Sequence, residues 1–288
     1  MKKMTMALAV AVILPMMSCT KGSCELDVSV AAPDSMKKKT ITFTFGGDGY
    51  EQQALTRASL SDANITDLWL FDYFGGELQQ TVHQQSTDAT FGVVSLDVDY
   101  GEHTLCFVAS RGDTPTIDGT VISWSKPSDT FWQSTTLNIQ PSTSTAQSVS
   151  LGRVATRLRI TVTDEIPSGL ATLSVTPSHW YYGLNYITGE AADDRQTARV
   201  VNVPSSYVGT TGQLAASFYC ISHATDWHTD VTVAARSADD ATIAAVTIPD
   251  VPLRRNSITE YSGTIFSAGR SVSIEVDDSW GDPIPGTW

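Results

Sequence analysis

The sequence predicts an all-β protein built from antiparallel sandwiches, and three features of its 288 residues indicate this class. Apolar and polar residues alternate with a period of two in many short runs, which is typical of strands with one buried face. Turn residues such as Gly75 with Gly76, and Asp118 with Gly119, separate these runs. No segment shows sustained helical periodicity, so we expect under about a tenth of the mature chain to be helical and no parallel sheet with crossover helices.

The strands follow from these alternating runs. In residues 40–45, Ile41, Phe43 and Phe45 fall on one face and three threonines on the other. Residues 65–73 form a nearly continuous apolar strand, and alternation returns at 154–162, 231–235 and 272–276. These runs predict strands in a regular succession with turns between them.

The length of the chain predicts two domains, because a single sandwich usually takes about 100 residues. A polar stretch at residues 140–145 marks the boundary, and the second domain's first strand is expected at Val154. We therefore expect a leader at 1–18, a tether at 19–38, an N-terminal β-sandwich at 39–151 and a C-terminal β-sandwich at 152–288.

The N-terminus predicts export and a lipid anchor. Lys2 and Lys3 precede an apolar segment at residues 4–17, which is too short to be a permanent membrane span. Ser18 directly before Cys19 resembles a bacterial lipobox, so cleavage between them would leave Cys19 as the acylated first residue, carrying palmitate among its lipids. An ordinary secretory signal is the alternative, and Cys24 is a second candidate for acylation.

Charge and cysteine content exclude several classes. Loss of residues 1–18 removes two lysines and no acidic residue, which changes the net charge from −13 to −15. Such an acidic surface argues against binding to nucleic acid. Cys106 and Cys220 lie inside apolar strands and are expected to be buried free thiols rather than disulfide or metal ligands.

No motif for catalysis or cofactor binding is found, so we expect neither an enzyme nor a cofactor. His223 and His228 are the nearest approach to a metal site, but their spacing on a strand would place them on opposite faces, and no metal is expected. His83, His103 and His179 are interpreted as ordinary polar positions. The alternative function is that of a glycan-binding outer-membrane surface lipoprotein, and it depends on Trp124, Trp132 and Trp180. If these side chains are exposed together, they favour glycan binding, whereas if they are buried they are core residues.

The order of several motifs resembles the fimbrillin-type subunits of type V pili. The lipobox, the strand at 40–45, the sequence around Arg57 and Ala58, and the apolar strand at 65–73 occur in the order found in that family. Further matches lie at residues 100–110, at 153–158 and at 255–259. The resemblance covers most of the chain, and the order of the motifs carries it.

The resemblance implies two tandem transthyretin-like antiparallel β-sandwich domains in a lipoprotein of the cell outer membrane or cell surface. It also implies cleavage by an arginine-specific protease, here at the Arg57–Ala58 bond, which frees the preceding strand. The place of Ile41, Phe43 and Phe45 would become a groove that a strand from another pilus subunit fills.

The last alternating strand, residues 271–276, is a candidate donor for such a groove. Pro283 and Pro285 follow it, and proline cannot join a central ladder. This favours an accessory, tip or anchor subunit of the fimbria over a stalk subunit.

Overall fold

The structure is a computed structural model that describes residues 37–45, 64–267 and 272–277. These residues form strands β1 to β20 and one short 3-10 helix, η1 (Ser205–Tyr207). The all-β class predicted from the period-two alternation is therefore confirmed. No helix in the described ranges has the length and apolar character needed to cross a membrane.

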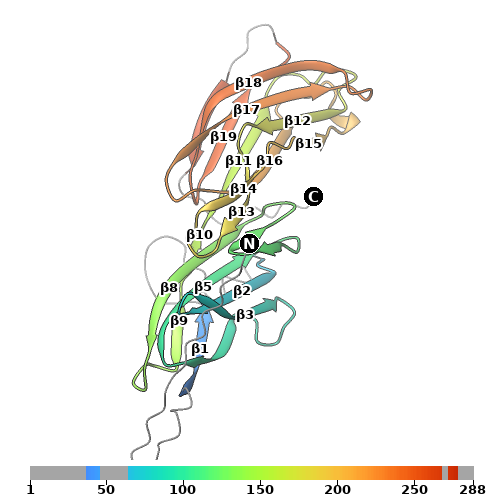
Figure 1. Cartoon of the computed structure of the whole chain (residues 1–288). Helices are drawn as coiled ribbons and strands as arrows, with labels where there is room; N and C mark the ends of the chain where they lie inside the picture. The colour runs from blue at the N-terminus through green and yellow to red at the C-terminus, as the bar shows by residue number, and fades with distance from the viewer. Residues whose placement is uncertain (1–36, 46–63, 268–271, 278–288) are drawn as a thin grey trace, which may run out of the picture. The chain divides into compact units, whose positions relative to one another are not determined.

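The first sandwich packs a three-stranded sheet against a five-stranded one. The smaller sheet has the order β4 (Val93–Asp99), β1 (Lys38–Phe45), β9 (Ala146–Val149). The larger has the order β10 (Gly152–Arg153), β8 (Thr130–Ile139), β5 (Gly101–Ser110), β2 (Asp67–Phe74), β3 (Glu77–Gln85). Alternate residues of both sheets, among them Ile41, Leu70, Leu96 and Phe107, form one buried core. Figure 1 shows β1, in blue, beside β9.

The second sandwich packs two four-stranded sheets. One has the order β16 (Leu214–Ile221), β11 (Ala155–Val162), β19 (Ile258–Gly263), β20 (Val272–Asp277). The other has the order β15 (Arg199–Asn202), β12 (Thr172–Pro177), β17 (Trp227–Arg236), β18 (Thr242–Leu253). Their core includes Leu158, Leu173, Val233 and Tyr261. Strands β15 and β16 each lie at the end of their sheet, as the described strands are ordered.

A fifth sheet combines strands from distant parts of the sequence. Its order is β14 (Ala191–Asp194), β13 (Tyr181–Asn185), β7 (Val121–Ser123), β6 (Thr116–Asp118). Residues of β13 and β7 share a buried cluster with Trp69 and Phe71 of β2, and the Phe71 ring stacks on the Tyr186 ring with centroids 3.8 Å apart. Strand β2 is thus buried on both faces, which explains why residues 65–73 are mostly apolar instead of alternating.

Two of the strand pairings are parallel, β1 with β9 and β11 with β19, whereas the other pairings of the described strands are antiparallel. Alternation within a strand cannot distinguish the two directions, because both place successive side chains on opposite faces. The described residues all fall within one compact unit. The predicted division between residues 39–151 and 152–288 stays a prediction.

Candidate functional site

Strand β1 occupies the centre of its sheet and is paired along both edges. It is antiparallel to β4, from Lys38 opposite Asp99 to Thr44 opposite Val93. On the other edge it is parallel to β9, with Phe45 opposite Val149. Taking β1 out would therefore leave two unpaired strand edges facing each other, which is the arrangement that accepts an added strand.

The inward face of β1 is closed by large apolar side chains. Ile41, Phe43 and Phe45 are at most 2% exposed. The rings of Phe43 and Phe45 each lie with their centroids 5.5 Å from the ring of Phe107 in the facing sheet. Burial of three such side chains contributes roughly 1.5–3 kcal/mol each, so β1 is a strongly held part of the core.

The outward face of β1 is polar and also bound. Thr40 donates to the Asp97 carboxylate at 2.5 Å, and the hydroxyls of Thr42 and Ser95 lie 2.8 Å apart. Near the beginning of the strand the Lys39 ammonium donates to backbone carbonyls of the turn between β8 and β9, including that of Pro141 at 2.8 Å. The segment that contains Arg57 and Ala58 follows β1 in the sequence. Those two residues, together with Ser18 and Cys19, lie outside the described residues.

The three tryptophans do not form an exposed patch. Trp124 and Trp180 are 0% and 1% exposed. Trp132 is half-buried, and its indole N–H donates to the Tyr186 carbonyl at 2.8 Å. Trp132 also packs so closely on Gly189, whose φ is +78°, that a Cβ there would lie 2.6 Å from the ring. Trp124 and Trp180 are core residues and Trp132 packs against the core, so the three give the glycan-binding alternative no support.

Cys106 and Cys220 are fully buried free thiols, as expected from the sequence. They belong to different cores, Cys106 to the cluster under the fifth sheet and Cys220 to the second sandwich. Burial raises the pKa of both thiols. This keeps them protonated at neutral pH and unsuited to metal or nucleophilic chemistry.

The interpretation of His103 as an ordinary polar residue is wrong. It is 2% exposed, and its Nδ1 lies 2.7 Å from Oδ1 of Asp72, which is 1% exposed. Its Nε2 lies 3.0 Å from the Asp99 carbonyl, and Gln80 donates to the second oxygen of Asp72. The available signal was Asp72 itself, because an acidic residue inside a continuous apolar strand needs a buried partner.

Three of the other four histidines also pair with a carboxylate, each with one, and His228 is exposed on β17. His83 lies 2.7 Å from Asp67, His179 lies 2.6 Å from Asp194, and His223 lies 3.1 Å from Glu190. In the described part of the chain, no three His, Cys, Asp or Glu residues come together as a metal site would require. Side-chain pairing, rather than coordination, accounts for these residues.

Two of the motifs that resemble fimbrillin-type subunits, at residues 153–158 and 255–259, are in contact where the chain passes from the first sandwich to the second. Arg153 donates to both oxygens of Asp129, from Nε at 2.7 Å and Nη2 at 3.1 Å, and its Nη1 donates to the Asn256 side chain at 2.8 Å. Asn256, with φ at 54°, also donates its backbone N–H to Ala155. The sequence showed both motifs but not their contact.

Together these features define a class: an all-β protein of two sandwiches with an added sheet, whose first strand lies in the middle of the N-terminal sheet. Solved structures share the fold. A proposed adhesin from Bacteroides ovatus matches with a TM-score of 0.55 and 11% identity, covering 81% of this chain and 88% of its own. The fimbrial anchor protein Mfa2 from Porphyromonas gingivalis matches with a TM-score of 0.51 and 8% identity, covering 83% and 97%.

A third solved structure, titled as proposed polysaccharide-binding proteins from Bacteroides thetaiotaomicron, matches with a TM-score of 0.54 and 10% identity, covering 83% of this chain and 96% of its own. At these identities the likeness shows the fold, and it agrees with the fimbrillin-type resemblance. No curated protein matches the sequence. Residues 116–287 match a protein family, so the chain belongs to the "Family of unknown function (DUF6562)".

Proposed function

We propose that this chain is a structural and adhesive subunit of a cell-surface fimbria, without catalytic activity, that joins other pilus subunits by β-strand addition. The observation that carries the proposal is the position of β1, paired on both edges and closed inward by Ile41, Phe43 and Phe45. If β1 leaves, an edge-lined groove with an apolar floor remains, and an alternating strand from a partner would satisfy both edges. Fold neighbours that include a fimbrial anchor protein and proposed adhesins support the assignment.

Export as a lipoprotein completes the proposal. Cleavage before Cys19 and acylation of its thiol would attach the subunit to the outer membrane, since two or more acyl chains anchor a protein stably. Cleavage at Arg57–Ala58 would separate β1, together with the lipid-bearing N-terminal segment, from the rest of the chain. The cut strand would stay in place until a partner strand displaces it, because its buried side chains and main-chain bonds persist after the cut.

The assembly experiment compares wild type with Arg57→Ala after treatment with an arginine-specific protease. We expect cut wild-type protein to form ladders of detergent-resistant oligomers and Arg57→Ala to stay monomeric. Arg236→Ala is the matched control, because Arg236 is a partly exposed arginine in the second sandwich and its loss should leave the ladders intact. Ladders of wild-type strength from Arg57→Ala would refute cleavage at this bond.

The lipid anchor is tested separately by metabolic labelling with a fatty-acid analogue. Cys19→Ala should abolish the label, whereas Cys24→Ala should retain it. The reverse pattern would move the anchor to Cys24, and a label on both variants would contradict acylation at either cysteine alone.

A further inference from the structure

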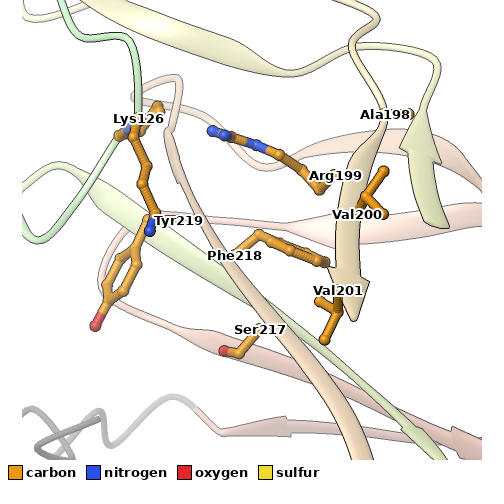
Figure 2. A pocket seen from close by; sticks show the side chains of 9 residues that line it. Lys126, Ala198, Arg199, Val200, Val201, Ser217, Phe218 and Tyr219 are labelled. Carbon is orange, nitrogen blue, oxygen red and sulfur yellow. The ribbon is translucent and has the colours of Figure 1, made fainter. Parts of the chain in front are cut away.

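A cavity of about 290 Å³ opens between the edge strands of the two sheets of the second sandwich. One wall is β15 with Arg199, Val200 and Val201, and another is β16 with Phe218 (Figure 2). The loop between β7 and β8 closes one side with Lys126 and Pro127. In the described part of the chain, β15 and β16 each pair with one neighbour only, so the cavity faces strand edges rather than a sheet interior.

Arg199 is the distinctive residue of this cavity. Its guanidinium lies over the Tyr182 ring, with Cζ 4.7 Å from the centroid. Its Nε is buried, and among the described residues it has neither a hydrogen-bond partner nor a carboxylate that forms an ion pair with it. Buried N–H groups are normally satisfied, so this arginine is held in position by an aromatic ring while one of its donors is left unused.

Arg195 provides the internal comparison. Its Cζ lies 4.5 Å from the centroid of the same Tyr182 ring, but its guanidinium donates to both carboxylate oxygens of Asp193, from Nε at 2.9 Å. Both arginines therefore contact the same aromatic ring, but only Arg195 is paired with a carboxylate. Arg195 has a carboxylate from the chain, whereas Arg199 extends toward the side of the cavity that carries Lys126 (Figure 2).

The charge around the cavity is opposite to that of the whole chain. Of the residues that the structure describes, Lys126 and Arg199 are the charged ones that line it and no acidic residue does, in a protein of net charge −13. Two cations beside low-dielectric walls concentrate anions locally. A guanidinium is planar and matches the two oxygens of a carboxylate, so a carboxylate suits the Arg199 head group that lines the cavity.

The apolar residues that line the cavity determine which chemical group can carry the carboxylate. Phe218 and Val201 also pack against the core of the second sandwich, and Pro127 is buried, so these apolar walls are fixed. Val200 is 59% exposed and borders the opening. A cavity of about 290 Å³ holds one compact ring or branched group. We propose that this cavity binds a monocarboxylate with a compact apolar body, with Arg199 and Lys126 on the carboxylate and Phe218 and Val201 on the body.

The test titrates the full, uncut chain with 3-phenylpropionate and follows binding by calorimetry or ligand-observed NMR. We expect saturable binding that weakens with added salt, and at least about tenfold weaker binding for 3-phenylpropanamide, which lacks the charge, and for acetate, which lacks the apolar body. Equal binding of the amide would overturn the role of the carboxylate. Equal or tighter binding of D-glucuronate would overturn the requirement for an apolar body. Equal or tighter binding of inorganic phosphate would overturn the assignment of the ligand as a carboxylate.

Arg199→Met is the decisive variant, and Arg195→Met is its matched control. Both remove one positive charge from the Tyr182 ring, but only Arg199 lines the cavity. We expect Arg199→Met to weaken 3-phenylpropionate binding about tenfold or more and Arg195→Met to change it less than about twofold. Equal effects of the two variants would refute the site.

A second variant avoids any contact with Tyr182. Val200→Glu places a carboxylate at the exposed border of the cavity, where it should compete for Arg199 and reduce binding without disturbing the core. Unchanged binding in Val200→Glu would count against the site. The carboxylate could belong to the C-terminus of a peptide or to a free small acid, and N-acetyl-leucyl-phenylalanine distinguishes the two, with its C-terminal amide as the uncharged control. Tighter binding of this peptide acid than of 3-phenylpropionate assigns a peptide C-terminus. Tighter binding of 3-phenylpropionate assigns a free small acid. Because binding is measured on uncut monomers, its outcome is independent of strand addition.

Discussion

Arg153 and Asp129 form a bidentate salt bridge in which both side chains are at most 5% exposed. The guanidinium also lies over the Phe131 ring, 4.8 Å from its centroid, and donates to the side chain of Asn256, which lies in the turn before β19. One arginine thus joins β8 and β10 of the first sandwich to the second. A buried charge pair of this kind costs desolvation, so its loss on one side only is severe.

We predict that Arg153→Met lowers the free energy of unfolding by about 3–5 kcal/mol, because the Asp129 carboxylate stays buried without its partner. Burial already raises the pKa of Asp129, and Arg153 opposes that shift. Without the guanidinium the folded-state pKa rises further above the unfolded value, so the stability deficit relative to wild type should be small near pH 4 and grow as the pH rises. Urea denaturation of both proteins near pH 4 and at neutral pH measures this difference in stability. Arg236→Met, which breaks a surface pair with Asp240, should change stability by about 0.5 kcal/mol or less.

Phe43→Ala should destabilise the protein by about 3–5 kcal/mol, because it opens a cavity against Phe107 in the first core. Thr44→Ala on the opposite face of β1 is the control and should cost less than about 1 kcal/mol. Denaturation curves of the uncut chain provide the comparison. Similar losses for the two variants would contradict the inward orientation of Phe43.

His103→Phe should lower the free energy of unfolding by about 1.5–3 kcal/mol. The ring contact with Phe74 survives this change, but the hydrogen bonds to Asp72 and to the Asp99 carbonyl are lost. His83→Phe is the matched control, since His83 lies at the same 2.7 Å from a carboxylate but its side chain is 37% exposed. It should cost less than about 1 kcal/mol. A larger effect at His83 would contradict burial as the source of the difference.

Gly189→Ala should cost about 1–3 kcal/mol, since it adds an overlap with the Trp132 ring to the strain of a positive φ. The same change in a Trp132→Ala background should cost less, because only the backbone strain remains. Gly209→Ala isolates that strain, because its φ is +75° and no atom of the described part of the chain lies within 4 Å of the added Cβ. A double-mutant cycle measures the coupling, and purely additive costs would refute the contact.

The sequence by itself determined several of the strands and, at residues 40–45, the face that is buried. The period-two pattern at residues 40–45 predicted that Ile41, Phe43 and Phe45 point inward, and all three are buried. The isolation of Cys106 and Cys220 in apolar strands predicted buried free thiols, which the structure confirms. Such properties are local, because a strand's two faces follow from the backbone pleat alone.

Only the tertiary structure decided which strands and side chains meet. Asp72 and His103 are 31 positions apart, and Arg153 and Asn256 are 103 apart, so no local pattern could pair them. The same holds for the central place of β1, for the added sheet that joins β7 to β13, and for the cavity between β15 and β16. Alternation states that a strand has a buried face, but every apolar face fits many others. The choice among them depends on contacts between distant strands, which form only when the whole chain folds.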